Sequence, residues 1–334
     1  MRLATAGPTL VVGRIRALGL EVALTKTEAL LFHGPRGGPR PGTRVTLDGV
    51  SARVGTQMRY LGLTLDGRWA FGAHFVELAP RVVKGAASLE RLVPNVGGPS
   101  VHCRRLYSGV IRNMAMYGAS VWADVLGRSN KTLLRCPQRV IATTAIRSYR
   151  TVSWTAACGL AGDPPWELQA EILAEIYGFV AARRSREEPP TLEEVARMRK
   201  QEQDTLLRRW TEDLAPPVPG QWTVDAMRPV LPYWVRRRFG LLTFRLVQVF
   251  SGHGRFGKSL HQIARREATR VCHKCGAPED TALHTPEVCA AWDLQRRALL
   301  AVVGRDLSLP RVLLICTFNS NISASCFLKI CLPC

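Results

Sequence analysis

The stretch CHKCGAPEDTALHTPEVC, residues 272–289, most constrains what this chain can fold into. Its spacing is Cys, two residues, Cys, eight residues, His, four residues, Cys. Zinc favours four ligands at tetrahedral corners, and a Cys-x-x-Cys turn lets two thiolates bind one ion. We therefore predict a zinc ion held by a Cys3His set, named here the Cys3His cluster: Cys272, Cys275, His284 and Cys289.

Protein side chains would fill all four positions of this site, which leaves no place for an activated water and favours a structural ion. Gly276 lets the chain turn sharply after the second cysteine, whereas His273 points elsewhere if both cysteines bind. The gap before His284 is longer than is usual in retroviral knuckles, so their loop geometry does not transfer. Small Cys3His knuckles commonly bind single-stranded nucleic acid. The alternative is that these four residues are unrelated in space.

The charge balance points to the same kind of partner. The 334 residues include 46 Lys or Arg against 26 Asp or Glu, a formal net charge of +20. Such an excess repels itself unless a polyanion offsets it, so nucleic acid is the leading partner. Seven of the basic residues are lysines, which leaves 39 arginines (46 minus 7). The planar fork of arginine suits phosphates, but a GC-rich gene would give the same bias, and both explanations stay open.

The apolar segments are short. None approaches the roughly 18 to 20 residues needed to cross a bilayer, and the first residues carry a charge inside their apolar part, unlike a signal peptide. We expect an intracellular protein without a membrane partner, in which clustered cysteines bind metal rather than form disulfides. The isolated Cys103, Cys136 and Cys158 are expected in the core.

The amino-terminal part predicts a helix, a turn at Gly19 and a strand pair around Lys26. RVTLDGVSARV and MRYLGLTLDG alternate apolar residues and contain Asp-Gly, which is typical of antiparallel hairpins. From His74 onward the period becomes helical. Five apolar residues at steps of three and four are predicted to form one buried helix face: Leu106, Val110, Met114, Tyr117 and Val121.

Helices are predicted over residues 138–147, 165–184 and 191–214, the last with Thr191 as its N-cap. The following residues 233–270, named here the basic segment, hold nine Lys or Arg and one acid and lead directly into the Cys3His cluster. A solvated helix face would explain them, but their position favours contact with nucleic acid. The arginines predicted to make this contact are Arg236, Arg237, Arg238, Arg245, Arg265 and Arg266.

Aromatic residues are interleaved with these arginines. Trp234, Phe239, Phe250 and Phe256 could stack on bases, although the pattern LLTFRLVQVF indicates that most of them lie in the core. The end of the chain is different, since residues 313–334 contain four cysteines and neither arginine nor acid. We expect residues 301–334 to be poorly structured and unrelated to the rest.

Several segments together resemble a known family. GLEVALTKTEALLF, MRYLGLTLDGRWAFGAHF, RRLYSGVIRNMAMYGASVWAD and LTFRLVQVFSGHGRFGKSL occur in this order before the Cys3His cluster. They resemble the carboxyl-terminal portion of a non-LTR (LINE-type) retrotransposon reverse transcriptase, in particular the type-1 elements specific for ribosomal DNA. That family has a right-hand fold.

The resemblance implies an α+β protein with five parts. Residues 1–75 would be the small antiparallel end of a polymerase palm, 76–160 a thumb-like helical region and 161–232 a helical connector. Residues 233–300 would form a basic helical region with a zinc knuckle, and 301–334 the tail.

The resemblance also implies roles near the palm. Lys26 takes the place of a lysine near the incoming nucleotide that is proposed to protonate the leaving pyrophosphate. The other interpretation is an exposed lysine at the end of a strand. Tyr60, Leu61 and Gly62 match the hairpin that presents the primer 3′ end, although Tyr-Leu-Gly is also a common strand ending in a turn.

The chain contains no Asp-Asp pair. Polymerisation with two magnesium ions needs carboxylates that hold both metals, and the family supplies them from an upstream aspartate and a Tyr-x-Asp-Asp hairpin. Asp48 and Asp66 lie in Asp-Gly turns, where their side chains stabilise the turn. Magnesium is therefore expected only for the intact polymerase.

We interpret the sequence as a fragment of an RNA-directed DNA polymerase, normally joined to an endonuclease, that acts in target-primed reverse transcription. Its partners would be the element RNA and the target DNA in the nucleus, with the upstream polymerase and endonuclease regions missing. Alone it should be inactive. Two alternatives are a stand-alone zinc-knuckle protein that binds nucleic acid and the product of a decayed element.

Overall fold

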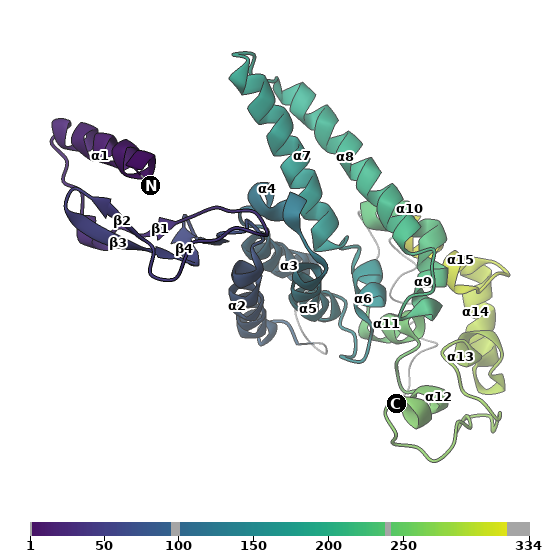
Figure 1. The fold of residues 1–334 in the computed structure, drawn as a ribbon. Coiled ribbons are helices and arrows are strands. Elements are labelled where there is room, and N and C mark those ends of the chain that lie inside the picture. Colours follow the sequence, from purple (N-terminus) through teal and green to yellow (C-terminus); the bar gives the residue numbers. More distant parts are fainter. Residues whose placement is uncertain (1, 95–100, 238–241, 319–334) are drawn as a thin grey trace. The chain divides into compact units, whose positions relative to one another are not determined.

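A computed structural model of the chain describes residues 2–94, 101–237 and 242–318 (Figure 1). The fold is mixed α and β, mostly helical with small sheets. The chain divides into two compact units, the first formed by Met1–Leu78 with Val121–Leu133 and the second by Ala79–Ser120 with Leu134–Cys334. Among the described residues, no helix is both long and apolar enough to cross a bilayer.

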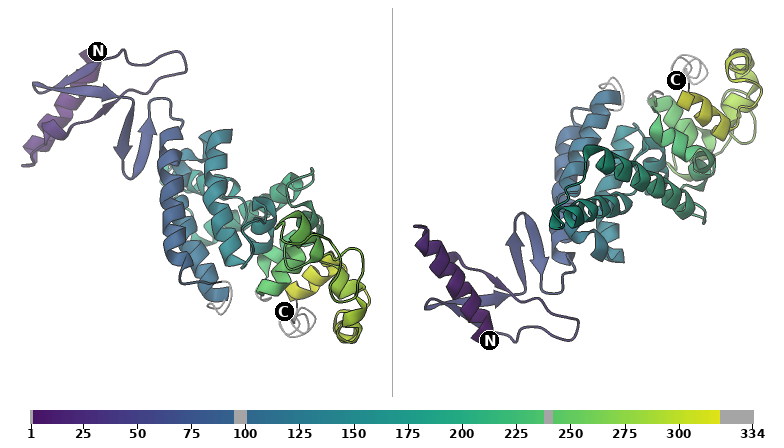
Figure 2. Two further views of the ribbon diagram at one scale, coloured as in Figure 1. Left: turned by 90° about the horizontal axis from the view of Figure 1, so that it is seen from below. Right: turned by 90° about the horizontal axis from the view of Figure 1, so that it is seen from above.

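The first unit holds all the strands found in the described residues. Helix α1 (Arg2–Ala17) is followed by the 3-10 helix η1 (Leu24–Lys26). Strand β3 (Val50–Gly55) pairs with β2 (Arg44–Leu47) in antiparallel fashion and with the short β1 (Ala29–Leu30) in parallel. Strands β4 (Gln57–Tyr60) and β5 (Leu63–Asp66) form a separate hairpin (Figure 2).

Both predicted hairpins are present, but they turn at different dipeptides. Asp48-Gly49 joins β2 to β3 with positive φ at both residues, as a two-residue hairpin turn requires. The second hairpin turns at Leu61-Gly62 instead, and Asp66 follows with a carboxylate that accepts the Arg68 and Ala70 N–H groups at 2.9 and 3.1 Å. The strand pair expected around Lys26 is wrong, because the chain closes a 3-10 turn there.

Aromatic rings pack edge to face in the first unit. Phe71 and Phe75 are almost fully buried, and Phe75 lies 5.1 Å from the Trp122 ring, measured between centroids. The Asn130 amide donates to the Ala70 carbonyl at 2.9 Å, which attaches the loop after β5 to the beginning of helix α5 (Arg128–Ala145). Ring packing of this kind stabilises a unit whose sheets are small.

The second unit is helical. Long helices α7 (Trp166–Ser185) and α8 (Leu192–Asp213) lie side by side (Figure 1). The shorter helices near the carboxyl end are α9 (Gln221–Met227), α10 (Leu231–Arg236), α11 (Phe244–Ser251), α12 (Gly257–Gln262), α13 (His284–Glu287), α14 (Asp293–Val303) and α15 (Leu309–Phe318). The remaining α-helices are α2 (Gly72–Glu90), α3 (Val101–Ala115), α4 (Ala119–Trp122) and α6 (Trp154–Ala161). Three of the α-helices, α2, α4 and α5, contribute residues to both units.

One hydrophobic core connects helices α6, α8, α9, α10, α11, α14 and α15. It includes Trp210 of α8, Trp234 of α10 and Phe250 of α11, each 2% exposed or less. The Trp234 indole donates to the Leu160 carbonyl at 3.1 Å, which satisfies its polar atom inside the core. As the pattern LLTFRLVQVF indicated, Leu246, Val247, Val249 and Phe250 are buried.

The predicted buried face of the third helix is wrong by one residue. The five residues assigned to it are between 40% and 71% exposed: Leu106, Val110, Met114, Tyr117 and Val121. The adjacent row is buried instead, with Tyr107, Ile111 and Ala115 at 5% or less. The Tyr107 hydroxyl donates to the Ala86 carbonyl of α2 at 2.9 Å, so a polar contact helps to choose the row. Helical periodicity alone fits either row, because adjacent rows share the same spacing.

Two further expectations are corrected. Cys103 and Cys136 are exposed, and only Cys158 of the three isolated cysteines is buried. The poorly structured tail was predicted to begin at residue 301, but Leu309–Phe318 forms helix α15 and buries Leu313 and Cys316 in the core. The reason is that a mainly apolar segment of this length can bury itself as a helix, so its unusual composition did not indicate a missing fold. Residues 319–334 lie outside the described residues, as does Phe239.

Helix α8 begins with the predicted cap. The Thr191 side chain accepts the Glu194 N–H at 3.2 Å, and the Glu194 carboxylate accepts the Thr191 N–H at 2.8 Å. This is a complete capping box, which satisfies two backbone donors at the helix terminus.

We predict that Thr191→Ala lowers the free energy of unfolding by about 1 kcal/mol, because it removes one half of the capping box. Urea denaturation followed by circular dichroism measures the change. Gln203→Ala, at an exposed position inside the same helix, is the matched control and should leave the midpoint nearly unchanged. Equal midpoints for Thr191→Ala and the wild-type protein would contradict the assignment of the cap.

Candidate metal centre

The four residues of the Cys3His cluster come together in the second unit. Their ligand atoms all lie within 4.8 Å of one another, and the Cys275 Sγ is 3.2 Å from the His284 Nε2. Cys272, His284 and Cys289 are buried, whereas Cys275 is exposed. The prediction that these residues gather in one place is therefore confirmed.

Short backbone hydrogen bonds position each half of the cluster. The Gly276 N–H donates to the Cys272 carbonyl at 2.8 Å, and the Cys272 N–H donates to the Ala277 carbonyl at 2.9 Å. Gly276 has φ of 75°, a left-handed conformation that favours glycine. The chain therefore turns sharply at Gly276, as predicted from the sequence.

The other half is held around His284. Its backbone N–H donates to the Thr281 Oγ1 at 3.1 Å, and its carbonyl accepts the Cys289 N–H at 2.8 Å. Helix α13 begins at His284, so a single helical turn separates the imidazole from the last cysteine. His273 lies apart, with Nε2 3.6 Å from a Glu267 carboxylate oxygen, as expected for the weaker candidate.

The thiols differ in their electrostatic surroundings. A hydrogen bond from the backbone of Ala277, followed by side-chain hydrogen bonds including one with His284, lowers the pKa of Cys275 to about 7. Burial raises the pKa of Cys289 to about 11, and the neighbouring cysteines add to that increase. Neutral thiols here would leave soft donors without a partner, whereas a divalent cation would stabilise them as thiolates.

The donor set fits zinc better than a hard cation. Sulfur and imidazole nitrogen are its preferred ligands, and three thiolates with one imidazole close a tetrahedral shell. The arrangement can hold a structural ion. Protein side chains would fill all four coordination positions, so none would be open to a substrate.

The cluster is connected to the basic segment through Asp280, which sequence reasoning did not single out. Its Oδ2 accepts the Gly257 N–H at 2.9 Å, and its backbone N–H donates to the Arg270 carbonyl at 2.8 Å. A Cβ added at Gly257 would lie 2.7 Å from that same carbonyl, so only glycine fits the close approach. The cluster is also contacted by Arg296, whose guanidinium donates to the Cys289 carbonyl at 2.8 Å.

The six arginines of the predicted contact have different surroundings. Arg265 and Arg266 are exposed immediately before the cluster, and Arg245 is half-buried on α11. Arg236 is 57% exposed and forms an ion pair with Asp204. Arg238 lies outside the described residues.

Arg237 packs against a tryptophan ring. Its guanidinium carbon lies 3.7 Å from the centroid of the Trp234 ring, and its Nη1 donates to the Trp234 carbonyl at 2.6 Å. Burial lowers the pKa of Arg237 to about 9. Packing on the indole leaves less of this half-buried guanidinium open to a phosphate, and its contact with nucleic acid stays a prediction.

The residues with implied roles in the palm lie in the first unit. Lys26 is exposed at the end of η1. Tyr60 and Leu61 are 56% and 72% exposed at the tip of the hairpin of β4 and β5, with Gly62 beside them. Their roles stay predictions.

Comparison with known proteins identifies several relatives of the chain. One relative is the retrovirus-related Pol polyprotein from type-1 retrotransposable element R1 4 of Nasonia vitripennis. The two sequences are 27% identical over an alignment of 342 residues, which covers 91% of this chain and 82% of that protein. The putative 115 kDa protein in type-1 retrotransposable element R1DM of Drosophila melanogaster is 28% identical over 300 residues. The chain is related to R1 retrotransposon polyproteins.

This relationship to R1 polyproteins extends over most of the chain. The retrovirus-related Pol polyprotein from type-1 retrotransposable element R1 of Bradysia coprophila is also 28% identical, over 82% of this chain. The chain spans only 28% of the length of the Drosophila and Bradysia proteins. No family model matches the chain, and no solved structure is significantly similar to it.

We predict that the purified protein, refolded with zinc at neutral pH, contains one zinc ion per chain. Cys289→Ser should reduce the zinc content to near zero, because it removes a buried sulfur ligand. The absorbance of a chromogenic chelator, added to the denatured protein, measures the zinc content. Cys136→Ser changes an exposed cysteine outside the cluster and should keep the metal. A metal-free wild-type protein would contradict the site.

Proposed function

We propose that this chain supplies nucleic-acid-binding parts of a retrotransposon-encoded RNA-directed DNA polymerase that acts in target-primed reverse transcription. The observation that carries the proposal is the assembled Cys3His cluster beside exposed arginines, in a chain related to R1 polyproteins. The parts are a primer-gripping hairpin, a thumb and a zinc knuckle.

The knuckle and its surroundings would hold nucleic acid mainly through phosphates. A formal charge of +20 supports a polyanionic partner. Arg265 and Arg266 are exposed, so their guanidinium groups can approach phosphates from the solvent side. The zinc ion would fold the loop that follows them and would take no part in chemistry.

The first unit would contribute to the polymerase palm. Tyr60, Leu61 and Gly62 form an exposed hairpin tip, which suits a role in holding the primer 3′ end. Lys26 is exposed and would act as the general acid for the leaving pyrophosphate. The helices within residues 76–160 would form the thumb, with contacts to the duplex backbone that are largely independent of sequence.

The reaction would need carboxylates from outside this chain. The absence of an Asp-Asp pair removes the usual holder of two magnesium ions, and Asp66 is occupied by its hydrogen bonds to Arg68 and Ala70. The complete enzyme would add an endonuclease and would act on target DNA in the nucleus.

A stand-alone protein that binds nucleic acid through the knuckle is the second candidate. The closed Cys3His cluster favours it, since such a site supports binding without catalysis. An upstream reading frame that encodes Tyr-x-Asp-Asp would favour the polymerase fragment, and a gene without that frame would favour the binding protein or a decayed element.

We predict that affinity for nucleic acid falls steeply between low and physiological salt, because counterions are released on binding. Arg265→Ala combined with Arg266→Ala should lower the affinity and reduce the salt slope by about 1 for each phosphate that the variant no longer neutralises. Fluorescence anisotropy with a labelled oligonucleotide measures both quantities.

The matched control for this pair is Arg184→Ala with Arg186→Ala, which removes equal charge from the end of α7 and the loop after it. It should change binding much less. Binding that is insensitive to salt, or an equal loss of affinity in both double variants, would argue against the assigned surface.

We also predict that the chain incorporates no deoxynucleotides on a primed RNA template with magnesium, because it lacks the carboxylate pair. Extension of a labelled primer on a denaturing gel is the readout, with a known reverse transcriptase as the positive control. Incorporation above the blank that a chelator abolishes would refute this prediction.

A further inference from the structure

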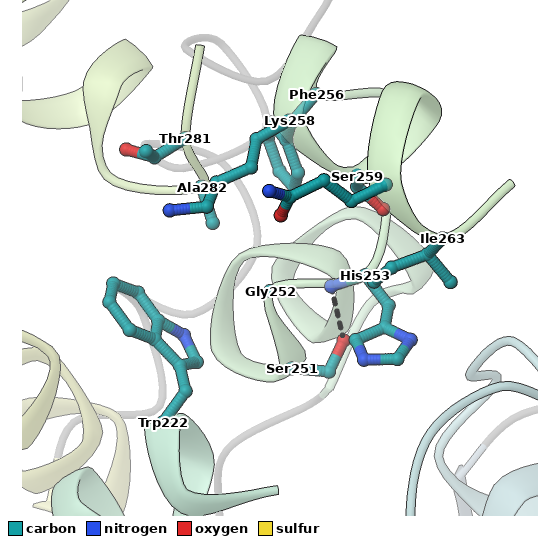
Figure 3. A pocket seen from close by; sticks show the side chains of 11 residues that line it. Trp222, Ser251, Gly252, His253, Phe256, Lys258, Ser259, Ile263, Thr281 and Ala282 are labelled. Carbon is teal, nitrogen blue, oxygen red and sulfur yellow. Dashed lines mark hydrogen bonds between the residues drawn. The ribbon is translucent and has the colours of Figure 1, made fainter. Parts of the chain in front are cut away.

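A cavity of about 230 Å³ lies in the second unit and is lined in part by Thr281 and Ala282, which closely precede His284 of the Cys3His cluster (Figure 3). Its walls come from helix α9, the end of α11, helix α12 and the loop that precedes His284. It is smaller than the roughly 300–1,000 Å³ of sites for drug-sized ligands, so it suits a single planar ring system. The metal ligands themselves do not line it.

Trp222 forms an aromatic wall of this cavity. It is 40% exposed, so one part of the indole remains open to a ligand. Its Nε1 donates to the Val249 carbonyl at 3.5 Å, which orients the ring. Gly252 has φ of 69°, and a Cβ added there would lie 3.4 Å from the Trp222 Cδ1. The glycine therefore lets the indole lie close against the backbone.

The opposite wall combines the apolar Ile263 with polar side chains. Figure 3 shows His253 and Ile263 across the cavity from Trp222. The His253 Nδ1 is 2.8 Å from the Thr151 Oγ1, and burial lowers the pKa of this histidine, which favours the neutral imidazole. Ser259 and Gln262 add a hydroxyl and an amide. Such groups suit the hydrogen-bonding edge of a neutral ring better than an anion.

Positive charge is found at the rim. Lys258 lines the cavity, with its ammonium 3.1 Å from a Glu279 carboxylate oxygen, so its charge is already partly balanced. Arg255 is exposed in the loop directly before Phe256, which also lines the cavity. A chain of phosphates could follow this rim while a ring attached to it enters the cavity.

The metal centre shapes this cavity. Thr281 and Ala282 form part of its wall, and the Thr281 Oγ1 accepts the N–H of the ligand His284 at 3.1 Å. Asp280, beside them, holds the amino end of α12 through the Gly257 N–H. Filling the Cys3His cluster would therefore also order one wall of the cavity.

We propose that this cavity binds one unstacked nucleobase of single-stranded nucleic acid, stacked on Trp222, with the adjoining phosphates near Arg255. The proposal rests on the function proposed above and adds a base-binding site to it. Duplex nucleic acid should bind this cavity more weakly, since a base must first be unstacked from the helix to enter it. RNA and DNA both present the ring that the cavity accepts, because their bases share the same stacking surface.

The test uses the full chain loaded with zinc and three oligonucleotides of equal length and charge: single-stranded RNA, single-stranded DNA, and a DNA strand with abasic residues. Fluorescence anisotropy measures each affinity. The wild-type protein should bind the abasic strand more weakly. Trp222→Ala should lower the affinity for strands that carry bases by about tenfold, within the range measured for the loss of one stacked base, and should not affect the abasic strand. A larger loss with RNA or with DNA identifies the source of the base.

Two variants make this test specific. Trp222→Phe keeps a stacking ring and should recover most of the affinity. Tyr177→Ala removes a 62% exposed ring from α7, away from the lining of the cavity, and should have no effect. Zinc content and circular dichroism confirm that each variant folds. Photocrosslinking of a thiouridine strand to the wild-type protein should label the peptide that contains Trp222, whether or not Trp222→Ala folds.

The outcomes separate this inference from the proposed function. If the wild-type protein binds none of the strands, the proposed function fails. If it binds all strands with equal affinity and Trp222→Ala binds as the wild-type protein does, the chain still binds nucleic acid and the base-binding site is refuted. Crosslinks that avoid the peptide of Trp222 would refute the site as well.

Discussion

Three cysteine sulfurs and one imidazole within 4.8 Å of one another form the arrangement on which the carboxyl-terminal part of this protein depends. Without a cation, the buried Cys289 resists ionisation, as its raised pKa shows. A zinc ion would convert the same residues into a closed shell and contribute to folding free energy. The loop between Cys275 and His284 has little apolar core of its own, so the metal would act as its core.

The same loop transmits that order to its neighbours. Asp280 bonds the backbone of Gly257 at the beginning of α12, and Thr281 bonds the backbone of His284. Through these two contacts the Cys3His cluster, the basic segment and the cavity beside Trp222 are joined by backbone hydrogen bonds. Binding of nucleic acid through phosphates and through a base would then use adjacent surfaces, which combines affinity with a preference for single strands.

Part of this was readable from the sequence. The spacing of the four ligands, the Thr191 cap and the Asp48-Gly49 turn each depend on residues close together in the chain, and all three were found as predicted. The relationship to R1 polyproteins was likewise implied by short segments in the right order. The prediction that Cys103 and Cys136 lie in the core was wrong, because the apolar character of a segment does not say which of its residues face the core.

The sequence by itself determined the candidate metal ligands, the long helices α7 and α8 and the hairpins, since these follow from local spacing and turn chemistry. Only the tertiary structure decided which row of α3 is buried, that Arg237 packs on Trp234, and that Leu309–Phe318 joins the core. It also brought Trp222 next to residues 251–263 and 281–282. The physical reason is that burial depends on which distant surfaces meet, and periodicity records only the spacing of side chains along one element.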